Sequence, residues 1–114
     1  MQLIDYRLVT KQIRLYLSEG GQMKINLAFN VSKNGEKDSN DYLSEMKLEF
    51  SSGEKKVADI IIAIQARVNG EIKNEQMDIF EILKPVYLVH INSLLSDVLL
   101  PPLSFTMLNR PTEK

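Results

Sequence analysis

The side chains best suited to acid–base chemistry in this chain are a lone histidine and a few carboxylates. His90 precedes Asp97 by seven residues, and Glu45 precedes Glu49 by four. Seven helical residues span about 10 Å, so His90 and Asp97 would not touch. Four strand residues span about 13 Å, and Lys47 would lie between the two glutamates. Because neither pair has a nucleophile or a third orienting group beside it, we expect no enzyme.

Composition argues against several other classes of function. The chain has 114 residues, no cysteine, and a formal net charge of −1 from 14 basic and 15 acidic residues. Without cysteine there is no disulfide, thiolate metal site or thiol nucleophile. The charges form no basic stripe that could neutralise phosphates, and the Asn-Gly and Gly-Gly dipeptides lack the spacing of a phosphate-binding loop. We therefore expect no cofactor, no metal and no nucleic-acid partner.

Length and apolar content predict one globular domain over residues 1–114, with 109–114 as a frayed tail. The most apolar stretch, 84–105, contains several polar residues, so it falls short of the roughly 20 apolar residues that a membrane-spanning helix needs. The first ten residues carry Asp5 and Arg7, which does not fit a signal peptide. We expect a cytoplasmic protein without membrane insertion.

Alternating apolar and polar residues predict strands through the first 70 residues. The alternation is cleanest in 23–31 and recurs in 46–50. Residues 3–17 and 57–72 also favour strands, and the latter is partly apolar on both faces, as central strands are. Four turns are predicted between and after these segments, at 18–21, 34–35, 52–56 and 69–70.

The apolar period changes to that of a helix after residue 73. Residues 74–83 predict a short helix, and a longer one is predicted to begin at Pro85 and to stop before Pro101-Pro102. One arc of the longer helix is apolar and consists of Tyr87, Leu88, Ile91, Leu94, Leu95, Val98 and Leu99. Strands grouped before helices indicate an α+β fold, an antiparallel four-stranded meander sheet with a short and a long helix packed on one face.

The opposite arc of the longer helix is only weakly polar. A helix that faces water normally carries lysine and glutamate there, whereas this arc has two serines, an asparagine, a histidine and one formal charge. Mild polar residues suit a surface that is covered but still hydrogen-bonded. We therefore predict an oligomer interface at Val89, His90, Asn92, Ser93 and Ser96. The alternative is a surface helix with few charges.

The order of these segments resembles that of the SecB-type export chaperone family. The resemblance spans about residues 6–108 and rests on "YRLVTKQIRLYL", "KINLAFNVS" and "EMKLEFSS" as strands. Its most specific part is the ending, a helix entered at Pro85 with Tyr87 just inside, and left through "PPLSF". The chain departs from the family in a crossover reduced to "SEGGQ". It also has Gln65 and Arg67 where an acidic docking patch would lie.

The resemblance implies a molecular chaperone or protein-binding module that holds non-native polypeptide, or one dedicated partner chain, without ATP. It implies a homodimer or homotetramer. It also implies docking on a translocation motor and a link to protein export. We predict the client or partner surface at Ile61, Ala63, Leu103 and Phe105. The alternative is an oligomeric scaffold or regulatory subunit that binds a folded partner, for example in a toxin–antitoxin or phage context, without general chaperone activity.

Overall fold

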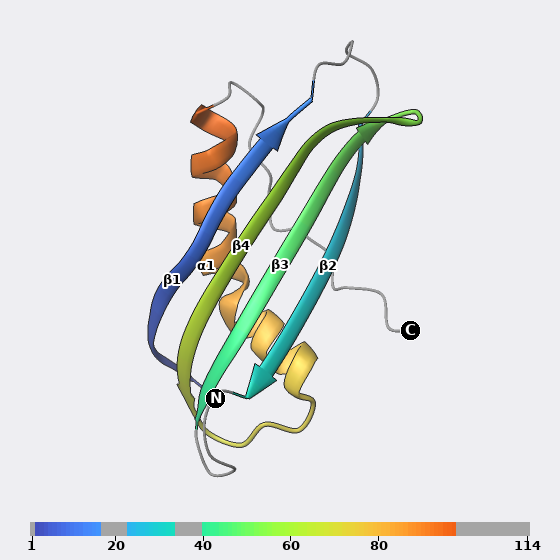
Figure 1. Cartoon of the computed structure of the whole chain (residues 1–114). Coiled ribbons are helices and arrows are strands. Elements are labelled where there is room, and N and C mark those ends of the chain that lie inside the picture. The colour runs from blue at the N-terminus through green and yellow to red at the C-terminus, as the bar shows by residue number, and fades with distance from the viewer. Residues whose placement is uncertain (1, 17–22, 34–39, 98–114) are drawn as a thin grey trace.

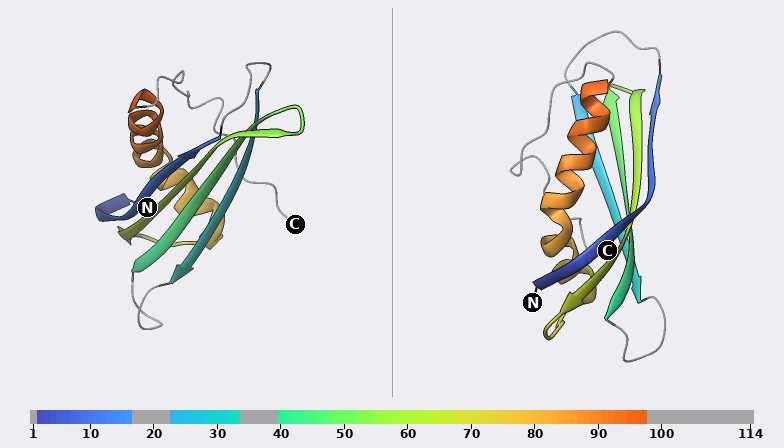
Figure 2. Two further views of the ribbon diagram at one scale, coloured as in Figure 1. Left: turned by 45° about the horizontal axis from the view of Figure 1, so that its top comes forward. Right: turned by 90° about the vertical axis from the view of Figure 1, so that its left-hand side faces the viewer.

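The computed structural model describes residues 2–16, 23–33 and 40–97. They form four strands and one helix: β1 (Gln2–Leu15), β2 (Met23–Lys33), β3 (Asp41–Ser52), β4 (Lys55–Asn69) and α1 (Glu75–Asp97). The strands make one antiparallel sheet, and α1 lies across one of its faces (Figure 1; Figure 2). The predicted α+β architecture is therefore confirmed.

The strands are ordered β1-β4-β3-β2 across the sheet. Strands β2, β3 and β4 follow one another as a meander, and a tight turn with Gly53 at φ 63° joins β3 to β4. Strand β1 pairs with β4 rather than with its neighbour in sequence, β2. Both β1 and β2 are consequently edge strands, on opposite sides of the sheet (Figure 1).

The register sorts the side chains onto two faces. We call the face that α1 covers the helix face, and the other, which no described element covers, the open face (Figure 2). The helix face holds the predicted inward residues, because Met46, Leu48 and Phe50 of β3 are buried there. Every even-numbered residue of β4 from 58 to 68 is also buried. Glu45, on the open face of β3, pairs in register with Ala63 of β4.

The two predicted helices form one continuous helix, so the prediction that a separate long helix begins at Pro85 is wrong. Pro85 lies inside α1, where it cannot donate the usual backbone hydrogen bond to residue 81. Glu81 and Pro85 are both exposed, so the proline lies on the solvent-facing side of the helix. The helix changes direction between its first and last turns instead of ending (Figure 1).

Aromatic residues hold both halves of this bent helix against the sheet. Phe29 of β2 packs edge-to-face on Phe80 at 5.2 Å between ring centroids, and on Tyr87 at 6.0 Å. Phe80 precedes the proline and Tyr87 follows it. The predicted apolar arc is buried from Tyr87 to Leu95, whereas Val98, Leu99 and the predicted exit at Pro101-Pro102 lie outside the described residues.

Candidate functional site

Exposed apolar side chains gather on strand β1. Of the seven large hydrophobic residues that are exposed in the described part of the chain, five lie on this strand. We call these five the β1 strip: Ile4, Tyr6, Leu8, Val9 and Leu15. The described side chains of the other edge strand, β2, include no exposed large hydrophobic residue. Such an uneven distribution marks an interaction surface better than isolated exposed residues would.

The outer side of β1 has unpaired backbone groups. The strand is 14 residues long and pairs with β4 on one side, and no described strand pairs with its other side. An unpaired edge is a template for another extended chain. The register shifts after Leu3 and again after Leu8, so Ile4 and Val9 are bulge residues. Bulges bend an edge strand, and they leave regular pairing over Asp5–Leu8 and Thr10–Leu15.

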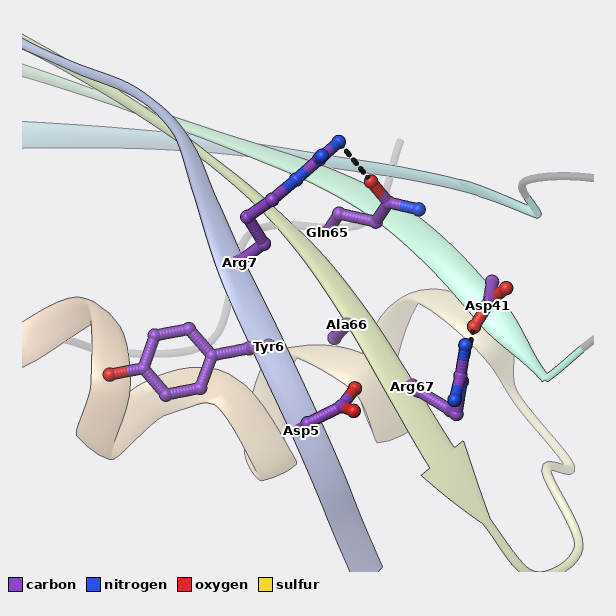
Figure 3. A pocket seen from close by; sticks show the side chains of 7 residues that line it. All are labelled: Asp5, Tyr6, Arg7, Asp41, Gln65, Ala66 and Arg67. Carbon is purple, nitrogen blue, oxygen red and sulfur yellow. Dashed lines mark hydrogen bonds and ion pairs between the residues drawn. The ribbon is translucent and has the colours of Figure 1, made fainter.

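The two sides of β1 differ in chemistry. Tyr6 pairs in register with Ala66 and Leu8 with Ile64, so both belong to the helix face. Figure 3 shows Tyr6 pointing toward α1, while Asp5 and Arg7 lie on the open face. Arg7 donates from Nη2 to Gln65 Oε1 at 2.7 Å on that side. Over residues 5–8, the helix-face side of the edge is therefore apolar and the open-face side polar.

The helix-face side of β1 meets α1 in a polar seam. The rings of Tyr6 and His90 pack edge-to-face with centroids 6.3 Å apart, and Lys11 Nζ donates to Ser93 Oγ at 3.1 Å. His90 Nε2 is buried and has no hydrogen-bond partner among the described residues. Burial, and to a lesser extent the charge of Lys11, lowers the pKa of His90. The seam thus favours neutral histidine.

A shallow hollow of about 370 Å³ on the open face is lined by residues of all four strands. Ala63 lies in its lining, and the exposed side chains of Val9 and Leu43 flank it. Ile61 lies two residues before Ala63 on the same face. The structure therefore places two of the predicted client residues together, next to a bulge of β1. The other two, Leu103 and Phe105, lie outside the described residues.

The predicted oligomer residues do not all face the same way. Val89, with 66% of its surface exposed, shares the outer side of α1 with the exposed Ser96, whereas Ser93 accepts the hydrogen bond from Lys11 in the seam with β1. Asn92 is half-buried, and His90 turns toward β1, where it contacts Tyr6. The oligomer interface on this outer side stays a prediction. His90 contacts β1 within the same chain.

The β1 strip is absent from the predicted site. Its signal in the sequence is the loss of strict alternation in "LIDYRLV", where adjacent apolar pairs, Leu3-Ile4 and Leu8-Val9, replace single apolar residues. Each pair includes a bulge residue. Within the described ranges, no three acidic or histidine side chains cluster as metal ligands would. None of the helices described is long and apolar enough to span a membrane.

Comparisons with known proteins bear on the fold. No protein-family model and no curated protein matches the sequence. Among solved structures, a SecB-like chaperone of Mycobacterium tuberculosis, in complex with a ChAD peptide from the HigA1 antitoxin, matches with a TM-score of 0.67 and 18% identity. The alignment covers 97% of this chain and 92% of that one. A protein of unknown function from Streptococcus agalactiae aligns over 88% of this chain and 90% of its own length, at 9% identity. Its TM-score of 0.34 is too low to inform the fold. The chain therefore has the fold of SecB-like chaperones, as the sequence resemblance predicts.

Proposed function

We propose that this protein binds extended polypeptide, either a non-native client or one dedicated partner chain, along strand β1. The observation that carries the proposal is the β1 strip, because its exposed apolar side chains lie on an edge strand whose outer side pairs with no described strand. A polypeptide added there gains backbone hydrogen bonds that do not depend on its sequence. It also buries apolar side chains against Tyr6 and Leu8.

This binding mode needs no nucleotide, because it consists of strand pairing and apolar burial. The similar Mycobacterium tuberculosis chaperone was solved with a peptide from an antitoxin, which supports a polypeptide as the ligand of this fold. Self-association through the outer side of α1, around Val89, belongs to the same proposal. Attachment to a translocation motor and a link to export rest only on the sequence resemblance.

The alternative function, a scaffold or regulatory subunit for a folded partner, predicts a different result in the same assay. An aggregation-prone client is diluted from denaturant with increasing amounts of the protein, and light scattering is followed. A chaperone should suppress scattering at ratios near one client per assembly. A scaffold should leave it unchanged.

The contribution of the β1 strip is tested with Tyr6→Thr combined with Leu8→Thr. Threonine keeps the strand propensity of the edge while removing most of the exposed apolar surface. We expect this variant to lose most of its suppression. Val57→Thr is the matched control, because it changes a half-exposed apolar residue at the far end of β4. Full suppression by the double variant would show that the client binds elsewhere.

A further inference from the structure

Three of the four cations on the central strands β3 and β4, all except Lys55, have carboxylate partners. Lys47 lies 3.6 Å from a carboxylate oxygen of Glu45, and Lys56 lies 3.5 Å from one of Glu49. Arg67 donates from Nε to Asp41 Oδ1 at 3.1 Å. These exposed pairs contribute little to stability, but they leave this part of the sheet nearly neutral.

The cations of β1 have no such partners. Arg7, Lys11 and Arg14 form no ion pair with any residue in the described part of the chain. Arg7 and Lys11 donate to the neutral oxygens described above. Arg14 is in register with Asp59, but that carboxylate accepts a hydrogen bond from the Tyr16 hydroxyl at 2.7 Å and lies 3.9 Å from Lys56.

These three charges lie on a strand whose only carboxylate is Asp5. Arg7 and Arg14 belong to the open face, on the opposite side from Tyr6 and Leu8. A strand paired with β1 would send alternate side chains to the two faces. Those on the helix face would meet Tyr6 and Leu8, and those on the open face would meet the guanidinium groups of Arg7 and Arg14.

A second copy of this chain would neutralise the positive charges of β1 less well than an acidic peptide would. Another β1 strand brings one carboxylate, Asp5, for three cations, so pairing between copies leaves most of the positive charge uncompensated. An acidic segment can place a carboxylate at each position opposite an arginine. Opposite charges on facing strands stabilise pairing, whereas like charges oppose it.

We propose that β1 selects extended segments in which apolar residues alternate with acidic ones. This inference rests on the proposed function, because it names the class of polypeptide that the same edge takes. The apolar residues lie on the helix face beside Tyr6 and Leu8. The acidic residues lie on the open face beside Arg7 and Arg14.

The test uses three labelled peptides of nine residues, capped at both termini and flanked by prolines that hinder pairing between peptides. Valine alternates with glutamate in the first, with glutamine in the second and with lysine in the third. Binding to the full-length protein is followed by fluorescence anisotropy. We expect the glutamate peptide to bind about 2-fold to 30-fold more tightly than the glutamine peptide at low salt, and the lysine peptide to bind least. The gap should narrow as salt screens the charges.

Arg7→Gln combined with Arg14→Gln should remove the preference for glutamate, so that the glutamate and glutamine peptides bind with equal affinity. Lys24→Gln is the matched control, because it removes an exposed cation from the opposite edge strand, β2. The preference should survive this change. The mass of each variant is measured without peptide. If the arginine variant alone changes mass, a second copy occupies the edge and the inference is wrong.

The remaining outcomes separate the two claims. If all three peptides bind equally, or the lysine peptide binds best, the charge inference is overturned and polypeptide binding at β1 stands. If the glutamate preference persists in the arginine variant, the selecting charges lie elsewhere, which also overturns it. If none of the peptides binds, the proposed function fails and the inference fails with it.

Discussion

Ser44 of β3 and Tyr87 of α1 share a hydrogen bond inside the core, with their hydroxyl oxygens 2.5 Å apart. Ser44 also donates to the carbonyl oxygen of Ile64 at 3.0 Å. Since serine has a single hydroxyl hydrogen, Tyr87 is the donor in the bond between them. Burial raises the pKa of Tyr87, so the hydroxyl stays protonated and keeps donating. The bond joins the helix to the middle of the sheet.

Ser44→Ala should destabilise the protein more than Tyr87→Phe. The alanine variant leaves the buried tyrosine hydroxyl without an acceptor, which should lower the free energy of unfolding by about 1–3 kcal/mol. The phenylalanine variant removes that hydroxyl and leaves Ser44 its bond to Ile64, so about 1 kcal/mol should be lost. Urea unfolding measures both. The double variant should lose less than the sum, and strict additivity would contradict the pairing.

Acidification should weaken the packing of α1 on β1 through His90. The folded chain holds the pKa of this residue below 6.5, chiefly through burial and then through Lys11, so the unfolded chain binds the proton more tightly. Above pH 6.5 the imidazole is mainly neutral in the folded and the unfolded chain alike, so it does not lower the free energy of unfolding. As the pH drops below 6.5 toward the folded pKa, the unfolded chain takes up the proton first, and the free energy of unfolding falls. No carboxylate from either element contacts the ring in the described structure; Lys11 and Tyr6 face it.

The free energy of unfolding of the wild-type chain and of His90→Phe is to be compared between pH 7.5 and 5.5. Phenylalanine retains a ring against Tyr6 and cannot be protonated. The wild type should lose more stability than the variant over this interval. Parallel losses in the two proteins would assign the pH dependence to other groups.

The outer side of α1 should form the contact between subunits. Val89→Lys together with Ser96→Lys places two charges there, and unpaired interfacial charges should raise the dissociation constant of the oligomer by about 30-fold or more. Light scattering after gel filtration reports the mass. Asn26→Lys with Asn30→Lys is the matched control, because it adds the same charges to the open face of β2. An unchanged mass for the helix variant would mean that this side faces water.

The open-face hollow beside Val9 should accept an apolar side chain of the client. Ala63→Tyr would fill it, since the added ring projects away from the core. Loss of one buried apolar side chain should weaken client binding by about tenfold. Anisotropy with an unfolded client measures this change, and Ala28→Tyr on β2 is the control. Equal affinities for the two variants would remove Ala63 from the client surface.

The sequence predicts strands β2, β3 and β4 well and the edge strand β1 poorly. Met46, Leu48 and Phe50 alternate strictly because one face of β3 is buried, so their burial follows from the pattern. In β1, bulges at Ile4 and Val9 interrupt the alternation of apolar and polar residues. No local sequence pattern indicates that β1 pairs with β4, which is far away in the sequence. The sequence predicts two helices because a proline usually begins or ends a helix. Only the folded structure shows that Pro85 is exposed and that the helix continues through it.

The most direct test of polypeptide binding at β1 is backbone hydrogen exchange with and without an unfolded client. Edge-strand amides on the unpaired side exchange readily, and an added strand protects them. We expect residues 2–15 to gain protection when the client is added, while residues 24–33 of the opposite edge strand do not change. Protection that appears on β2 instead, or no change on β1 at saturating client, would contradict this binding site.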